Sequence, residues 1–318
     1  CEVGKGTVGH SFVRTLSEAV GAYVAVASSP VGHADLGGEW MLNVGDVIAP
    51  QLNIPEWHGV LGLISIPLSG SYTGHGGGEY LNYAAFAALR ADGSVVTWGF
   101  GSYGGDSSSV ASSLDGSIDV RQVYSNWDAF AALRSDGSVV SWGQGGSYSS
   151  DVAAKLNGSV AVTQVFSTRE AFAALRSDGS VVTWGKSNFG GDSGAASSSL
   201  DGTVDATQVF STERAFAALR SDGSVVTWGD GAYGGDSSGV AAKLDGSVDV
   251  TQVFSTEKAF VAVRSDGSVV TWGDGPSGGD SSGVAATLDG SIDVTQVFAN
   301  DGAFAALRTD GSVVTWGY

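Results

Sequence analysis

The sequence predicts a mainly β protein assembled from copies of one small sheet, and three observations predict it. A 15-residue segment, AFAALRSDGSVVTWG, occurs at 171–185 and again without change at 215–229. Four close copies begin at 85, 129, 259 and 303, and the spacing between copies is 44 residues with one exception of 42. Each copy holds an Asp-Gly pair between two apolar runs, which is a strong β-hairpin signal. A period of this size is typical of proteins that repeat one supersecondary unit.

The elements of one unit follow in order in the copy around Trp228. Segments 207–211, 215–219 and 225–228 are rich in apolar residues, and we expect each to be a strand. Asp222-Gly223 is expected to form the tight turn of a hairpin, with positive φ at both residues. A fourth strand is expected from residues 234–244 or just after them. These elements favour a β-propeller of about six to seven blades, in which small antiparallel sheets surround an axis.

The first part of the chain does not carry the repeat. Residues 1–62 combine a helical pattern at 11–22 with two short strand candidates, which predicts a small α/β segment. Residues 63–83 contain a glycine-rich stretch and are expected to be a linker. The repeats of the propeller then occupy residues 84–318.

Composition sets limits on the class of partner. In 318 residues the acidic side chains outnumber the basic ones 33 to 15, which gives a net charge of −18. Such a field repels phosphate backbones and anionic lipid, so nucleic acid is not an expected partner. The longest apolar run, 60–68, is too short to span a bilayer. The chain begins with Cys1, its single cysteine, so we expect a processed or truncated piece whose export signal was on the missing part.

Five segments of the repeat carry a resemblance to a known family. They are the turn Asp222-Gly223, the strand 225–229 that ends in Trp-Gly, the glycine-rich loop 231–235, and the apolar segments 248–254 and 259–263. In this order they resemble the blade of the regulator-of-chromosome-condensation family, whose best-known members are seven-bladed propellers. Gly-Gly-Asp-Ser replaces the family's Gly-Gln-Leu-Gly. The histidine that usually precedes the apolar strand in that family is absent. The chain therefore looks like the bacterial branch, and the nuclear roles of the eukaryotic members are not carried over.

Residues 1–62 carry a second resemblance through Cys1-Glu2, Gly9 to Phe12, and the Leu-Gly-Gly-Glu-Trp segment at 36–40. They look like the C-terminal half of a caspase-like domain of unknown function found in large secreted proteins of cyanobacteria and marine bacteria. The resemblance implies that Cys1 is the nucleophile of a Cys/His pair. None of the four histidines lies at the family's position, so no catalytic residue is assigned and the chain is not expected to be an enzyme. A lipid-bearing first residue of a lipoprotein is an alternative role for Cys1.

The loops that follow each Trp-Gly are the first candidate binding elements, because their sequences vary and carry aromatic residues. An exposed aromatic ring beside polar groups can stack on a sugar, and the alternative is that the ring packs on its own blade. The residues are Tyr103, Tyr148, Phe189 and Tyr233. Trp127 is a further candidate contact residue, because the equivalent turns of other copies carry Arg or Glu.

The Gly-Asp-Ser segments are candidate calcium ligands, since carboxylate and hydroxyl oxygens are the donors that Ca²⁺ prefers. Capping of a turn is the alternative role of these aspartates. They are Asp106, Asp192, Asp236 and Asp280. Calcium is the one cofactor that these residues lead us to consider. The six repeat tryptophans are expected to pack between blades, and the Arg and Asp that flank each hairpin turn to cap strands.

These patterns favour a non-enzymatic, exported surface or matrix protein that acts in adhesion or assembly through its repeated loops. Near-identity between copies indicates selection for geometry rather than for one unique pocket. Expected partners are further copies of the chain, or a surface glycan or protein, outside the cell or at its surface. Two alternatives remain open, a lectin-like propeller and a fragment of a caspase-like cysteine peptidase that lacks its histidine half.

Overall fold

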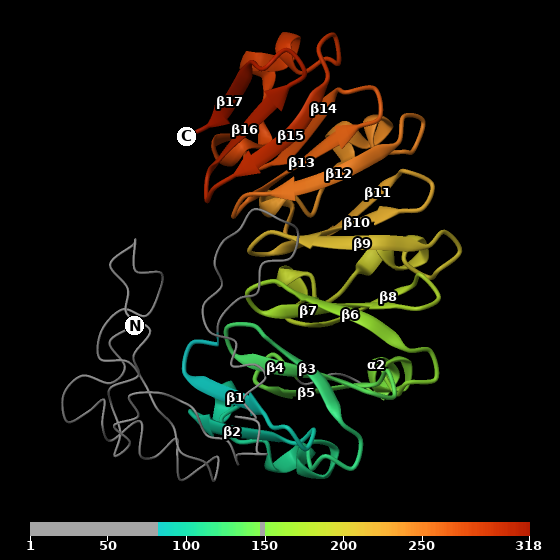
Figure 1. The fold of residues 1–318 in the computed structure, drawn as a ribbon, viewed down its shortest axis with the longest axis vertical. Coiled ribbons are helices and arrows are strands. Elements are labelled where there is room, and N and C mark those ends of the chain that lie inside the picture. The colour runs from blue at the N-terminus through green and yellow to red at the C-terminus, as the bar shows by residue number, and fades with distance from the viewer. Residues whose placement is uncertain (1–81, 147–149) are drawn as a thin grey trace, which may run out of the picture. The chain divides into compact units, whose positions relative to one another are not determined.

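A computed structural model describes residues 82–146 and 150–318, which form six antiparallel sheets repeated in series (Figure 1). The described residues all belong to the second of two units of the chain, Ser65–Tyr318. The first sheet pairs two strands, and each of the other five has three, with the AFAALR-type strand in the middle. The prediction of a mainly β protein with about six repeated sheets is confirmed. The expected helix at 11–22 and the strand candidates at 23–27 and 39–44 lie outside the described residues.

The strands keep nearly the same bounds from one repeat to the next. In chain order the sheets are β1 (Ala85–Leu89) and β2 (Val95–Gly99); β3 (Val120–Ser125), β4 (Ala129–Arg134) and β5 (Val139–Gly143); β6 (Val162–Ser167), β7 (Ala171–Arg176) and β8 (Val181–Gly185); β9 (Ala206–Ser211), β10 (Ala215–Arg220) and β11 (Val225–Gly229); β12 (Val250–Ser255), β13 (Ala259–Arg264) and β14 (Val269–Gly273); and β15 (Val294–Ala299), β16 (Ala303–Arg308) and β17 (Val313–Gly317).

The connections between repeats are short helical turns. They are η2 (Gly101–Tyr103), η3 (Ser108–Ser113), α2 (Ser150–Lys155), η4 (Ser187–Phe189), η5 (Gly194–Ser199), η6 (Gly231–Tyr233), η7 (Ser238–Lys243), η8 (Gly275–Gly279) and η9 (Ser282–Thr287). The expected fourth strand at 234–244 or just after it is therefore wrong, because η7 occupies 238–243 and no strand forms before β12. The Ala, Ser and Gly residues of that segment lack the β-branched side chains that favour strands.

The hairpin turn is confirmed, but it is longer than the predicted two-residue turn. The N–H of Arg220 donates to the oxygen of Ser224 at 2.9 Å, and the N–H of Gly223 donates to the oxygen of Arg220 at 3.0 Å. Three residues thus separate the hydrogen-bonded pair Arg220 and Ser224, with φ of 74° at Gly223. This is the geometry of a type I turn followed by a left-handed glycine. Asp222 supports it by accepting hydrogen bonds from the N–H and hydroxyl of Ser224.

Successive sheets pack face to face and bury the core between them. We call the face of a sheet that packs on the preceding repeat its trailing face and the opposite one its leading face. Between the sheets of β6–β8 and β9–β11, the leading face supplies Phe166 and Leu175, and the trailing face supplies Val209, Phe216 and Trp228. The indole and phenyl rings of Trp228 and Phe216 stack at 5.3 Å and are almost completely buried. The expectation that the repeat tryptophans pack between blades holds for this residue and its buried equivalents.

Each buried tryptophan also makes a hydrogen bond to the preceding repeat. The indole N–H donates to the oxygen of a loop glycine in four repeats: Trp142 to Gly104, Trp228 to Gly190, Trp272 to Gly234 and Trp316 to Gly278, at 3.0–3.1 Å. Trp184 donates to the hydroxyl of Ser141 at 3.2 Å, and the repeat before it is two residues shorter than the others.

Candidate binding surface

One residue from each turn between the first two strands of a repeat joins a continuous column. The N–H of each residue donates to the carbonyl oxygen of its counterpart in the next repeat, at 2.9–3.0 Å. The column therefore ties consecutive repeats together through the backbone. In order it contains Tyr83, Trp127, Arg169, Glu213, Glu257 and Asp301.

The side chains of this column also interact along its length. The guanidinium of Arg169 lies 3.3 Å from the centroid of the Trp127 ring, within the range of a cation–π contact. Its Nη1 lies 2.7 Å from Oε1 of Glu213, and the rings of Tyr83 and Trp127 are 5.6 Å apart. Both sides of Trp127 thus have neighbours from the column. A role of Trp127 in binding a partner stays a prediction, and its ring already contacts Tyr83 and Arg169 of its own chain.

The carboxyl groups of Glu213 and Glu257 influence each other further along the column. Burial raises the pKa of Glu213, but hydrogen bonds from Arg169 and Glu257 outweigh it, so the pKa is lowered overall. Burial raises the pKa of Glu257, and the hydrogen bond and negative charge of Glu213 raise it further. Glu257 is therefore the member that holds the proton at acid pH. As the pH rises through its folded-state pKa, that proton is lost and two negative charges face each other.

The replacement Glu257→Gln is expected to stabilise the protein at neutral pH. The amide keeps a donor toward Glu213 at every pH, whereas Glu257 loses its donor when it ionises. Because a raised pKa gives stability that is lost as pH rises, the gain should be about 1 kcal/mol at pH 7. It should shrink toward zero below the ordinary pKa of glutamate.

Urea unfolding of both proteins across this pH range measures the gain. Asp245→Asn is the matched control, since Asp245 is an exposed turn carboxylate with a lowered pKa. A gain for Glu257→Gln that is the same at both ends of the pH range would contradict the shared proton.

Cationic side chains from the turns cover the aromatic rings of the loops. Arg214 lies between two rings, 4.9 Å from the centroid of Phe189 and 4.6 Å from that of Tyr233. Lys186 lies 4.7 Å from the Phe189 ring, and Lys258 lies 5.7 Å from the Tyr233 ring. Phe189 is only 3% exposed, so its ring packs on its own protein. Tyr233 is half-buried and also packs against the core.

Tyr103, the candidate of the first repeat, belongs to a small aromatic group. Its ring lies 5.4 Å from that of Phe100 and 6.3 Å from that of Tyr83. Its carbonyl oxygen accepts a hydrogen bond of 2.8 Å from the Asn82 side chain. Two other candidates, Tyr148 and Cys1, lie outside the described residues. Sugar binding by these loop aromatics stays a prediction.

The four candidate calcium ligands all serve as caps of local turns. Asp106, Asp192, Asp236 and Asp280 each accept a hydrogen bond from the N–H two residues later, at 2.8–2.9 Å. In Asp106, Asp236 and Asp280 that hydrogen bond lowers the pKa. No cluster of three His, Cys, Asp or Glu side chains suited to a metal occurs within 82–146 and 150–318. Calcium binding by single loop carboxylates stays a prediction.

The Arg and Asp that flank the hairpin turns have the capping role that the sequence suggests. In the turn after β10, Nη2 of Arg220 lies 3.6 Å from Asp222, and Nε donates to the Ser224 hydroxyl at 2.7 Å. The same pattern occurs at Arg134 and Arg264. These pairs fix the turns at the end of the middle strand opposite the column.

The cations that cover the aromatic rings were not among the sequence-based candidates. In the sequence, the turns and loops show only an alternation of charge at these positions, which are Arg169, Arg214, Lys186 and Lys258. Their pairing with rings of neighbouring loops depends on the stagger between repeats, which the periodicity alone does not give. One such pair has a signal in the sequence, since Arg214 of a turn is followed by Tyr233 of the next loop nineteen positions later.

The sheets in series, their buried Phe-Trp stacks and the column of turns define a repeat protein of the β-propeller type. Among solved structures, the chain is similar to the ectodomain of the Physcomitrella patens receptor kinase CR4, at 15% identity over 77% of this chain and 63% of that one, with a TM-score of 0.41. It is similar to Prp20p from Saccharomyces cerevisiae, at 19% identity over 75% and 71%, with a TM-score of 0.41. The β-propeller domain of Cps50 from Myceliophteria thermophila gives 13% identity over 80% and 86%, with a TM-score of 0.30.

These values say nothing about what this chain binds. The chain spans 63% of the length of the receptor-kinase ectodomain. A family model described as a domain of unknown function, DUF4347, matches residues 1–57, inside the segment expected to be caspase-like. No curated protein matches the chain. In the part of the chain that the structure describes, no helix is long and apolar enough to cross a membrane.

Proposed function

We propose that this chain is a non-enzymatic, exported surface or matrix protein whose repeats act in adhesion or assembly. The observation that carries the proposal is that successive sheets pack through two complementary faces, so a leading face such as that of β15–β17 accepts the trailing face of another sheet. Support for export comes from the resemblance of residues 1–62 to a domain of large secreted proteins, and the strongly acidic composition is compatible with a saline exterior. We expect the repeats to make the contacts, because the described repeats present similar turns and loops at the surface.

The leading face of β15–β17 carries the apolar residues that the other sheets bury. Phe298 is 50% exposed, whereas its equivalent Phe210 is 3% exposed. Val313 is 61% exposed, whereas its equivalent Val225 is 7% exposed. Along β17, exposed and buried residues alternate, as in a strand with one covered face and one uncovered face. Exposed apolar patches of this kind mark interaction sites.

A sheet of a second copy of this chain is the partner that fits this face. In each of the other repeats the same leading face is covered by a trailing face built from Val, Phe and Trp, and that surface is complementary to it. The first sheet carries the same residue types in the same register, as Val96 and Trp98. Trp98 is the one repeat tryptophan whose indole N–H has no acceptor among the described residues. Contact between two different faces gives a head-to-tail interface, which builds rings or open chains.

Light scattering coupled to gel filtration tests the proposal on the chain as it stands. We expect a mass above that of one chain which grows with concentration, and a return to one chain in Phe298→Asp. Gln296→Asp is the matched control, because its equivalents Gln164, Gln208 and Gln252 stay exposed even under a covering repeat. A monomer at every concentration, or assembly that persists in Phe298→Asp, would overturn the proposal. Repetition with calcium and with chelator tests the calcium prediction separately, since only a calcium-dependent mass would support it.

A further inference from the structure

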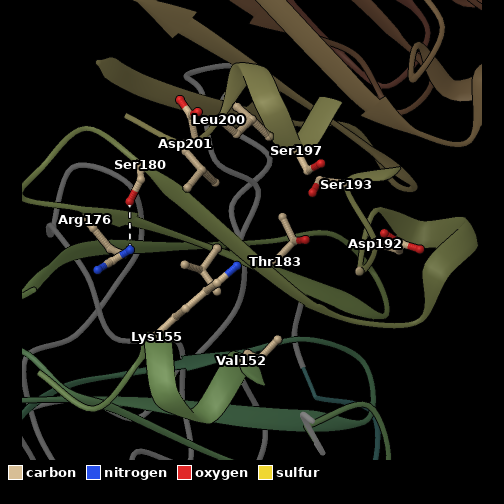
Figure 2. A pocket seen from close by; sticks show the side chains of 13 residues that line it. Val152, Lys155, Arg176, Ser180, Thr183, Asp192, Ser193, Ser197, Leu200 and Asp201 are labelled. Carbon is tan, nitrogen blue, oxygen red and sulfur yellow. Dashed lines mark hydrogen bonds between the residues drawn. The ribbon is translucent and has the colours of Figure 1, made fainter. Parts of the chain in front are cut away.

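A pocket lies beside the one repeat that is shorter than the others. The spacing from Trp142 to Trp184 is 42 residues, and the Gly-Gly-Asp-Ser loop is missing there. The helix α2 stands where the other repeats have 3-10 turns. Next to α2 is a pocket of about 390 Å³, within the size range of small-molecule sites. Its walls come from α2, β8 and η5 (Figure 2).

The lining combines an apolar floor with polar groups of both charges. Val181 and Leu200 belong to the buried core, and Val152 packs against it. Around them stand cations, carboxylates and hydroxyl groups. The polar side chains are Lys155, Arg176, Ser180, Thr183, Asp192, Ser193, Ser197 and Asp201.

Thr183 differs from its equivalents because its hydroxyl is not bonded within its own repeat. Thr97, Thr227 and Thr271 donate to the hydroxyls of Ser107, Ser237 and Ser281, at 2.9, 2.9 and 3.0 Å. The corresponding pair, Thr183 and Ser193, makes no such hydrogen bond in the described structure, and both residues line the pocket. Two hydroxyl groups that are paired elsewhere are therefore open toward the pocket.

The cause of this opening is one glycine. Gly194 stands where Ser108, Ser238 and Ser282 stand in other repeats. Its φ is 48°, a left-handed conformation that glycine adopts at little cost. The preceding Ser193 has φ and ψ of −76° and −10°, whereas Ser237 has −106° and 13°. The loop thus turns differently and moves the serine hydroxyl away from its usual partner.

The two cations of the pocket retain unused donors. In the turns of Arg134, Arg220, Arg264 and Arg308, Nε donates to the serine hydroxyl at 2.7–2.8 Å. Arg176 bonds to Ser180 through Nη1 at 3.0 Å instead, its Nη2 lies 3.6 Å from Asp178, and its buried Nε has no partner among the described residues. The Lys155 side chain makes no ion pair with a described residue and extends from α2 toward Thr183 (Figure 2).

We propose that this pocket binds one sugar that carries a carboxylate, a single hexuronic acid, whose one negative charge is met locally by Lys155 and Arg176 in a chain that repels polyanions. Lys155 and Arg176 supply the charged donors that a carboxylate takes. Thr183, Ser193 and Ser197 supply hydroxyls, and Asp192 and Asp201 supply acceptors for the hydroxyls of the ring. The apolar floor of Val152 and Leu200 faces the C–H groups of the sugar. Because the pocket lies away from the exposed face of β15–β17, it does not depend on the assembly proposed above.

Calorimetric titration of the purified chain with glucuronic acid, and with glucose as the neutral probe, tests this assignment. We expect glucuronic acid to bind and glucose to bind at least tenfold more weakly. Lys155→Met should weaken glucuronic acid binding by tenfold or more. Lys243→Met is the matched control and should leave it unchanged, since Lys243 occupies the same place in a repeat with the regular loop.

A second variant tests the origin of the pocket. Gly194→Ser restores the residue of the regular repeats, and it should close the Thr183–Ser193 hydrogen bond and reduce binding without loss of the fold, as followed by circular dichroism. Three results would each overturn the proposal: no binding of glucuronic acid, equal binding of glucose, or undiminished binding by Lys155→Met.

Discussion

Replacement of Trp228 by alanine is expected to lower the free energy of unfolding by about 3–5 kcal/mol, as for other large aromatic side chains removed from a core. The ring is 3% exposed, stacks on Phe216 at 5.3 Å, and donates to the oxygen of Gly190 in the preceding repeat at 3.1 Å. The variant therefore loses packing within its own sheet and a hydrogen bond across the interface. The surrounding strands are held by further repeats on both sides, so the vacated space cannot close easily.

Trp98→Ala is the matched control for this prediction. Trp98 occupies the same register against Phe86, with ring centroids 5.5 Å apart, but it is only half-buried and its N–H has no acceptor among the described residues. Chemical unfolding followed by far-ultraviolet circular dichroism gives both free energies. A loss for Trp98→Ala equal to that for Trp228→Ala would show that interface packing is not what makes these tryptophans important.

The replacement Gly223→Ala is expected to cost about 1–3 kcal/mol from backbone strain alone, because φ is 74° there. A steric cost comes in addition. A Cβ at this position would lie 2.6 Å from Oδ1 and 2.7 Å from Cα of Asp249, so the backbone of the segment that crosses the turn must move. That segment leads into β12, and the N–H of Val250 donates to the oxygen of Gly223 at 2.9 Å. The variant thus disturbs the link from one repeat to the next.

Gly239→Ala supplies the control from the same repeat. No heavy atom lies within 4 Å of a Cβ built at Gly239, and its φ is not in the left-handed range. Alanine there should leave stability unchanged or raise it by a few tenths of a kcal/mol, by restricting the unfolded chain. The denaturation midpoints of the Gly223→Ala and Gly239→Ala variants test this expected difference in stability. Equal midpoints would mean that the turn tolerates a Cβ at Gly223, and that the glycine found at this position in each copy has another cause.

The repeated strands were predictable because they depend on local pattern. The apolar runs at 207–211, 215–219 and 225–228 became β9, β10 and β11 with bounds shifted by at most two residues. The fourth strand was not predictable in the same way, since a segment such as 234–244 has no strong preference and takes its form from capping. There Asp236 and the glycines stabilise turns instead. The three-residue hairpin turn likewise depends on Ser224 and on the crossing segment, which lie beyond the Asp-Gly pair.

The candidate site was predictable only in its parts. The sequence singled out Trp127, Phe189 and Tyr233 because they vary among otherwise constant copies. It did not show that Arg169 and Arg214 lie on their ring faces, since the partners come from different repeats and meet through packing. The pocket at Lys155 depends on a deletion of two residues in one repeat and a glycine in the next. Departures from the repeat were therefore more informative about function than the repeat itself.

The column of turns from Tyr83 to Asp301 has a consequence for how such a chain can change over generations. Its backbone hydrogen bonds link each repeat only to its two neighbours, and the buried faces between sheets do the same. A whole repeat inserted or removed by recombination would meet the same two interfaces that its predecessor met. The number of repeats can then change while the contacts between neighbouring repeats stay the same in kind, so repeats can be gained or lost without new contact residues.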